Sequence, residues 1–246
     1  MSIMNDQLDA AMVASILARV AERRPRIHCL TNTVAQNVTA NMLLAFGAVP
    51  SMASHPDEVA AVAAGAGAIL INLGTINLEG ERAVPKLLEV ARAQAKPLVL
   101  DPVFVELSPL RLRLAEEALR LPGIVVRGNI TEMQALAPLL AAAPGATRVT
   151  TGAIDRIEAP GGSLEIGHGH ALMAKVTGLG CASSALVAAC CAVEDNPLLA
   201  AGAALTAYGI AGEIAAERSN GPGSFAMHLV DALANLDAAT LQARIG

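Results

Sequence analysis

Short hydrophobic runs alternate with longer helical patterns along the first part of the chain. The hydrophobic runs predict strands over Ile27–Thr31, Pro50–Ala53, Ala68–Leu73, Pro97–Leu100 and Gly123–Val126. An amphipathic helix is expected over residues 8–23. Further helices are expected near Asn37–Phe46, Asp57–Gly65, Glu79–Ala95 and Pro109–Arg120. Strands that alternate with helices form βαβ units, so the pattern predicts a parallel sheet.

The pattern changes after a further strand at Arg148–Thr150. Two short alternating runs, Arg156–Ala159 and Ser163–Ile166, flank a glycine pair and predict a hairpin. The rest is mostly helical, with helices expected over Ala182–Val193, Pro197–Arg218 and Met227–Leu236 and a break at Asn220–Gly223. No linker-like tract interrupts residues 1–246. We therefore expect a single α/β domain with a mainly parallel central sheet flanked by helices.

Composition narrows the classes of function. The net charge is −5 and aromatic residues make up 2% of the chain. A chain with no basic patch and few rings for stacking bases is not expected to bind nucleic acid. The longest apolar stretches, near Val59–Ile71 and Gly178–Val193, are shorter than the ~18–20 residues of a membrane span. We expect a cytoplasmic protein that does not enter a membrane.

The segment Lys175–Cys181 is the first candidate for chemistry, because Gly178 and Gly180 come just before a long apolar helix. Glycines there let the backbone amides face an anion such as phosphate, and the helix dipole adds positive potential. A thiol in the first helical turn, that of Cys181, is expected to have its thiolate favoured. A glycine-rich turn followed by a buried cysteine is the structural alternative.

Polar turns follow the predicted strands, and in parallel sheets ligands gather at that edge. Asp101 ends one strand, and Arg127, Glu132 and Thr151 follow the next two. Arg127 is suited to phosphate, whereas Asp101 and Glu132 each have an alternative as a turn or helix-capping residue. The five histidines show no metal-binding spacing.

Taken together, these segments resemble hydroxyethylthiazole kinases of the ribokinase-like superfamily. The resemblance runs from about residue 27 to 237. The segments that carry it are His28–Asn32, Asn37–Ala53, Leu70–Thr75, Leu100–Val103, Arg127–Asn129, Thr151–Gly152, Lys175–Cys181 and Gly221–Phe225. It implies ATP-dependent phosphorylation of the hydroxyethyl group of 4-methyl-5-(2-hydroxyethyl)thiazole in thiamine salvage.

The resemblance also implies roles on the substrate side. Met52 would contact the thiazole, and Gly178 would approach it through its backbone. Asn32 would lie near the same pocket. Cys181 would be the catalytic residue beside the substrate hydroxyl, where many ribokinase-like enzymes carry an aspartate.

On the nucleotide side, the resemblance implies that Arg127 and Thr151 bind ATP. Asp101 and Glu132 would organise Mg²⁺, directly or through water. The partners are then small molecules, a thiazole alcohol and ATP. The family resemblance further implies a homotrimer with thiazole sites between subunits.

Three segments depart from the family pattern. Bulky residues, Phe104–Ser108, replace a Gly/Ala-rich loop after Val103, and Leu179 stands within the Gly-X-Gly-Cys turn. The connection between Glu132 and Thr147 is also short. These departures motivate two alternatives, a kinase for another hydroxymethyl heterocycle such as a pyrimidine, or a non-catalytic thiazole-binding homologue.

Overall fold

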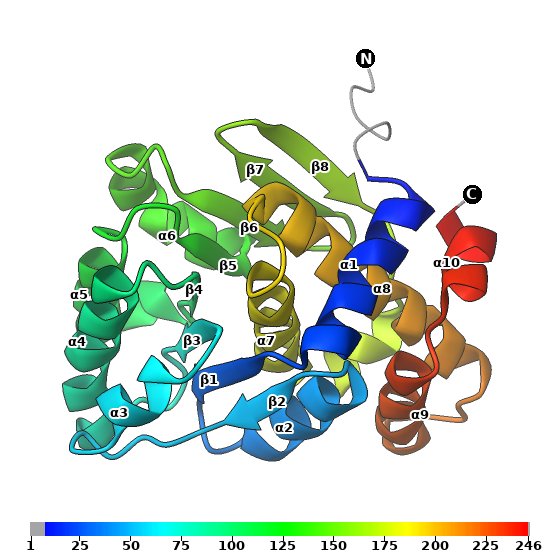
Figure 1. The fold of residues 1–246 in the computed structure, drawn as a ribbon, viewed down its shortest axis with the longest axis horizontal. Helices are drawn as coiled ribbons and strands as arrows, with labels where there is room; N and C mark the ends of the chain where they lie inside the picture. Colours follow the sequence, from blue (N-terminus) through cyan, green and yellow to red (C-terminus); the bar gives the residue numbers. More distant parts are fainter. Residues whose placement is uncertain (1–7, 246) are drawn as a thin grey trace.

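The computed structural model describes residues 8–245, which form a single α/β domain around one eight-stranded sheet (Figure 1). The sheet order is β2-β1-β3-β4-β5-β6-β7-β8. The parallel strands are β1 (Arg26–Leu30), β2 (Val49–Ser51), β3 (Ala68–Asn72), β4 (Leu98–Asp101), β5 (Val125–Asn129) and β6 (Thr147–Thr151). Two antiparallel strands, β7 (Asp155–Ala159) and β8 (Gly162–Ile166), complete it.

Helices cover both faces of the sheet. One face carries α1 (Ala10–Arg23), α2 (Gln36–Ala45), α7 (Leu179–Cys191), α8 (Pro197–Glu217), α9 (Pro222–Ala234) and α10 (Ala238–Ile245). The other carries α3 (Val59–Ala64), α4 (Leu78–Ala93), α5 (Pro109–Ala118) and α6 (Ile130–Ala141). Short 3₁₀ turns lie at Val105–Leu107 and Ala171–Lys175.

Alternation along the strands separates the two cores. Leu70 and Val99 face the core under α7, whereas their chain neighbours Ile69 and Leu100 face the core under α3–α6. Successive side chains in a strand point to opposite faces, so strands buried on both faces read as continuous apolar runs. This is why the sequence pattern located these strands within a few residues.

The predicted parallel sheet and hairpin are confirmed, and the C-terminal helices needed correction. Helix α9 begins at Pro222, not at Met227 as the break signal indicated. Proline at the first helical position has no amide to satisfy and its φ suits a helix, so it starts α9. Helix α10 was not predicted at all. Only Leu241 is buried in α10, so its apolar signal is weak.

Helix α8 is the most apolar long helix among the described residues. Among the described residues it is long and apolar enough to cross a membrane by length and composition, yet 83% of its apolar window is buried inside the protein. It packs between α7 and α9 and against α1, with Ala and Gly at most contacts. Burial of this kind is typical of a core helix.

The loop after β4 is strained. Val103 and Phe104 have φ values of 20° and 53°, a region that side chains with a Cβ disfavour. Phe104 is 55% exposed at the start of the 3₁₀ turn Val105–Leu107.

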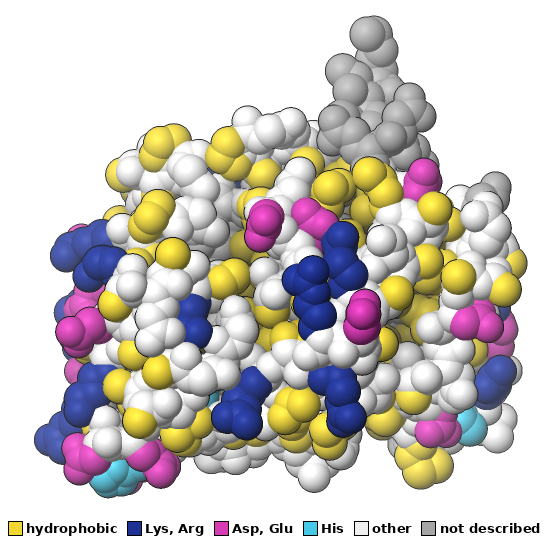
Figure 2. Space-filling model, viewed as in Figure 1, with side chains coloured by type: hydrophobic (Ala, Val, Ile, Leu, Met, Phe, Trp, Pro, Cys, Tyr) yellow, Lys and Arg dark blue, Asp and Glu magenta, His cyan; other side chains and the backbone are white. Residues whose placement is uncertain are grey.

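On the face drawn in Figure 2, basic side chains lie in separate groups among acidic and apolar ones.

Candidate active site

The strand register gathers polar side chains at the carboxyl edge of the sheet. Asn72 and Asp101 are the last residues of β3 and β4 and lie opposite each other in the register. Both share parity with core residues that face α7, so their side chains lie under that helix. Arg127 has the same parity on β5. The predicted convergence of these turns is therefore seen for Asp101 and Arg127.

Helix α7 begins over this edge. Gly178 is its N-cap residue with φ 85°, and a Cβ there would lie 2.9 Å from Cγ1 of Val38. A residue other than glycine would be strained in this conformation and would also press on α2. Cys181 is the third residue of α7 and is half-buried. The structure thus places Gly178 and Cys181 at the helix start that the sequence predicted.

A chain of hydrogen bonds connects Cys181 to Asp101. The Asn32 Nδ2 donates to Cys181 Sγ and to Asn72 Oδ1, at 3.2 Å each. The Asn72 Nδ2 in turn donates to Asp101 Oδ2 at 2.7 Å. Ser184, one turn after Cys181, donates to the same oxygen at 2.8 Å. Four chain segments meet here around one thiol and one carboxylate.

Asp101 is 4% exposed, and burial raises the pKa of its carboxyl group. The Arg127 charge and the Ser184 hydrogen bond act in the opposite direction. Within residues 8–245, both hydrogen bonds that Asp101 accepts through its side chain use Oδ2. Its Oδ1 is therefore left for a ligand such as a cation.

The prediction that the thiolate form of Cys181 is favoured is wrong. Burial, followed by the charge of Asp101, raises the pKa of the Cys181 thiol above its ordinary value of 9.0. The amides of Asn72 and Asn32 and the charge of Arg127 only partly oppose this rise. Desolvation by burial is therefore the largest influence on the pKa of this thiol.

Arg127 points under α7. Its Nη1 donates to the carbonyl oxygen of Gly180 at 3.0 Å and lies 3.4 Å from Ser184 Oγ. Arg127 is 9% exposed, and its Nε is buried with no hydrogen-bond partner in the described chain.

Thr151 is the last residue of β6, where it pairs with Asn129 of β5 and is half-buried. Its hydroxyl donates to the carbonyl of Gly128 at 3.3 Å.

Glu132 is held by backbone amides. Its Oε2 accepts from the N–H of Asn129 at 2.8 Å, which completes a capping box at the start of α6. Its Oε1 accepts from the N–H of Phe104 at 2.9 Å. The capping alternative raised by the sequence is thus seen in the structure. Glu132 also ties the strained loop after β4 to α6.

The remaining site prediction, Met52, lies just after β2 and is partly buried against the core under α7. Sequence reasoning missed Asn72 and Ser184. Asn72 could have been found from the sequence, because it is a single amide at the end of the otherwise apolar strand β3. Ser184 carries no such signal, because serine is common within small-residue helices.

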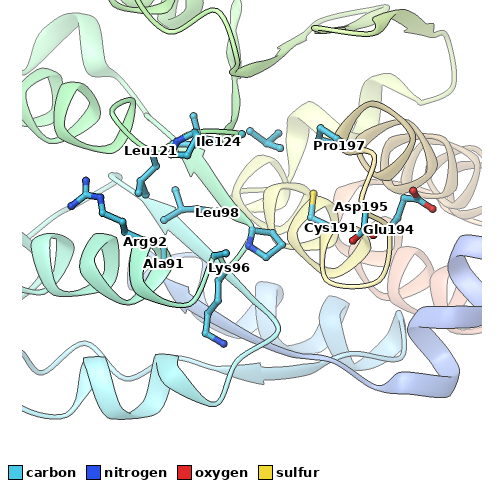
Figure 3. Close-up of a pocket in the computed structure, with 15 residues that line it drawn as sticks. Ala91, Arg92, Lys96, Leu98, Leu121, Ile124, Cys191, Glu194, Asp195 and Pro197 are labelled. Carbon is cyan, nitrogen blue, oxygen red and sulfur yellow. The ribbon is translucent and has the colours of Figure 1, made fainter.

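A separate cavity of about 380 Å³ opens at the opposite edge of the sheet. It lies between the starts of β4 and β5 and the end of α7, and Leu98, Ile124 and Cys191 line it. Figure 3 shows Arg92, Lys96 and Glu194 extending away from one another around it. None of the predicted site residues lines this cavity, so it is separate from the candidate site at the carboxyl edge.

Known proteins are similar to this chain over most of its length. The model of the hydroxyethylthiazole kinase family matches residues 17–146 and 137–239. A probable hydroxyethylthiazole kinase from Agrobacterium fabrum is 41% identical over 227 residues, which cover 92% of this chain and 91% of that protein. The chain belongs to the hydroxyethylthiazole kinase family. The two matched segments overlap at residues 137–146.

Solved structures place the fold. A hydroxyethylthiazole kinase protein from Pyrococcus horikoshii OT3 superposes with a TM-score of 0.89 at 36% identity, covering 94% of this chain and 96% of that one. A ribokinase-like superfamily protein from Enterococcus faecalis V583, 13% identical, has a TM-score of 0.63 over 95% of this chain and 91% of its own. The hydroxyethylthiazole kinase family therefore has the ribokinase-like fold expected from the sequence.

Proposed function

We propose that this protein transfers the γ-phosphoryl group of ATP to the hydroxyethyl group of 4-methyl-5-(2-hydroxyethyl)thiazole, in thiamine salvage. Family membership over most of the chain supports the reaction and the substrate. The observation that carries the proposal is the meeting of Cys181, Asp101 and the start of α7 at one edge of the sheet. Phosphoryl transfer needs mainly positioning and charge stabilisation, and this edge supplies both.

The start of α7 is the part of the site that stabilises charge. The first backbone amides of a helix lack internal partners, and the dipole favours an anion there. The amides of Leu179, Gly180 and Cys181 would face charge that develops on the transferred phosphoryl group. Arg127 would bind the phosphates of ATP from below α7, and Thr151 would contact the nucleotide at the end of β6. Gly178 and Met52 would contact the thiazole.

The donor set fits Mg²⁺. This ion is usually held by one or two carboxylates together with substrate phosphates and water. Asp101 offers its Oδ1 directly, whereas both oxygens of Glu132 already accept backbone hydrogen bonds, so Glu132 would act through water. Among the described residues no group of three His, Cys, Asp or Glu side chains could hold the ion by itself, and substrate phosphates and water would complete the shell. Mg²⁺ would neutralise phosphate charge.

Cys181 would lie beside the substrate hydroxyl. Since its pKa is raised, the thiol is mostly protonated at neutral pH. It can therefore orient the hydroxyl as a thiol, and only its thiolate fraction can accept the proton. Because alcohols are far weaker acids than thiols, the proton leaves late, after most of the phosphoryl transfer.

The proposal also includes the oligomeric state of the protein and its location in the cell. The protein would work in the cytoplasm as a homotrimer with thiazole sites at subunit boundaries, and the whole chain, residues 1–246, would act as one kinase domain. Family membership supports the trimer. The apolar side chains of Val34, Leu44 and Met227 are more than half exposed and could contact a neighbouring subunit.

An ADP-release assay tests the function. Thiazole alcohol, a hydroxymethylpyrimidine and pyridoxal are each offered with ATP and Mg²⁺. We expect release that depends on the thiazole alcohol and on the metal, and a product with one phosphate by mass spectrometry. A clear preference for another alcohol would overturn the substrate, and calorimetric binding of the thiazole without nucleotide binding or turnover would favour a non-catalytic protein.

A further inference from the structure

Two buried amides, those of Asn32 and Asn72, join the thiol of the proposed site to its carboxylate. Their orientations are fixed by the backbone, since Asn32 Oδ1 accepts from Ala35 N–H at 2.9 Å and Asn72 Oδ1 accepts from Gly74 N–H at 3.0 Å. Because each amide oxygen is held in this way, each NH₂ group points away from the N–H that holds the oxygen, and that of Asn72 points toward Asp101. The two hydrogens of Asn32 then meet Cys181 Sγ and Asn72 Oδ1.

Gly74 makes room for this arrangement. A Cβ at this position would lie 2.9 Å from Asn32 Nδ2 and 2.9 Å from Asn72 Oδ1. Such contacts are too short for a methyl group, so any side chain at residue 74 would push the amides apart. The absence of a side chain at Gly74 therefore allows the amides that follow β1 and end β3 to meet under α7.

We propose that Asn32 is a positioning residue that acts through Cys181, and that Asn72 links it to Asp101, so that the thiol and the carboxylate keep one fixed separation during phosphoryl transfer. This inference rests on the proposed function for its effect on turnover. The hydrogen-bond geometry also makes Cys181 Sγ an acceptor. Its own S–H is thereby left to face the substrate hydroxyl.

The charged and titratable groups near the sulfur do not replace this link. Asp101 on β4 repels a thiolate, Arg127 on β5 attracts it, and the hydroxyl of Tyr208 on α8 donates to the carbonyl of Leu179 at 3.2 Å instead. Asn32 donates a hydrogen bond to Sγ at 3.2 Å, and the amide of Asn72 also lowers the pKa of the thiol. Replacing the NH₂ group of Asn32 by a carboxylate oxygen should therefore remove this hydrogen bond and repel a thiolate at Cys181.

The experiment compares Asn32→Asp with Asn41→Asp. Asp at residue 32 keeps the bond to Ala35 but places an acceptor against Sγ and Asn72 Oδ1. Asn41 is exposed on α2, so its variant adds the same charge without touching the site. We expect Asn32→Asp to lower kcat about tenfold or more, with KM for the alcohol changed less than about threefold. Asn41→Asp should behave as the parent.

A double-mutant cycle separates positioning from structure. In a Cys181→Ala background, Asn32→Asp should change kcat less than about twofold, because the group through which it acts is gone. An equal loss in both backgrounds would make Asn32 merely structural and overturn the inference. Gly74→Ala, which removes no polar group, should also lower kcat. Gly145→Ala, where a Cβ meets nothing within 4 Å, is its control.

A second readout does not need turnover. The alkylation rate of Cys181 by iodoacetamide is followed by peptide mass spectrometry, with thermal unfolding as a check that each variant is folded. Asn32→Asp should slow alkylation severalfold, and Asn41→Asp should not. If the parent releases no ADP, the proposed function fails, and the alkylation rates still decide the link. Equal rates in Asn32→Asp and parent would overturn the link even in an active enzyme.

Discussion

Ser184 donates a hydrogen bond to Asp101 across 2.8 Å, although 83 residues separate them in the chain. The bond ties the second turn of α7 to the last residue of β4. It shares Oδ2 with the amide of Asn72 and keeps a buried carboxylate in one orientation. A charge in such surroundings lowers stability, since burial raises the pKa of this group.

The first prediction therefore concerns Asp101→Asn. The folded state holds the Asp101 proton to higher pH than the unfolded chain does, so ionised Asp101 destabilises the fold as pH rises through its pKa. The amide can still accept from Asn72 and Ser184. We expect an equal or higher Tm at pH 7.5, together with loss of Mg²⁺-dependent turnover. A lower Tm by calorimetry would show that the charge itself stabilises the site.

The second prediction concerns the proton acceptor. The pKa of Cys181 is raised above 9.0, so its thiolate fraction grows about tenfold per pH unit between pH 7 and 9. If the thiolate accepts the proton, kcat should rise over this interval. In Cys181→Asp the carboxylate is already ionised, and kcat should be nearly flat and at least that of Cys181→Ser. Superimposable pH profiles for parent and Cys181→Ser would assign the proton to another group.

The third prediction concerns Glu132→Gln. Gln offers one acceptor oxygen where Glu132 accepts from both Asn129 and Phe104. We expect a loss of about 1–2 kcal/mol in unfolding free energy, and turnover that falls far more than calorimetric thiazole binding. Glu89→Gln, exposed on α4, is the matched control. Unchanged turnover at saturating Mg²⁺ would leave Glu132 as a helix cap alone.

The fourth prediction is acid destabilisation through His28. Burial lowers the pKa of this histidine from 6.5 to about 4, and its Nε2 has no hydrogen-bond partner in residues 8–245. The unfolded chain binds the proton below pH 6.5 and the folded chain only below about 4, so stability falls between these values. The loss amounts to about 3 kcal/mol. In urea unfolding, the free energy of unfolding of His28→Asn should fall less between pH 6.5 and about 4 than that of the parent or of the exposed control His55→Asn.

The fifth prediction is the homotrimer. Light scattering at micromolar concentration should give three times the chain mass of 25.0 kDa. Met227→Glu, which places a charge on an exposed apolar position of α9, is expected to weaken the assembly, while Met12→Glu on α1 serves as a comparison. A single-chain mass for the parent would rule out sites shared between subunits.

The sequence by itself determined the elements and their order. Strands buried on both faces are mostly apolar, as residues 68–71 of β3 are, and polar helices between them leave few topologies other than a parallel sheet. It also located the start of α7, because Gly178 adopts a left-handed conformation that favours glycine. These features depend on residues close together in the chain.

Only the tertiary structure decided the chemistry of the site. Asn32 meets Cys181 across 149 residues, and Asn72 meets Asp101 across 29, through a register that no local pattern encodes. The same packing reversed the expectation for Cys181, because the desolvation that raises its pKa comes from elements folded around it. Burial and long-range hydrogen bonds are properties of the assembled sheet and helices, so residue types and spacings alone cannot specify them.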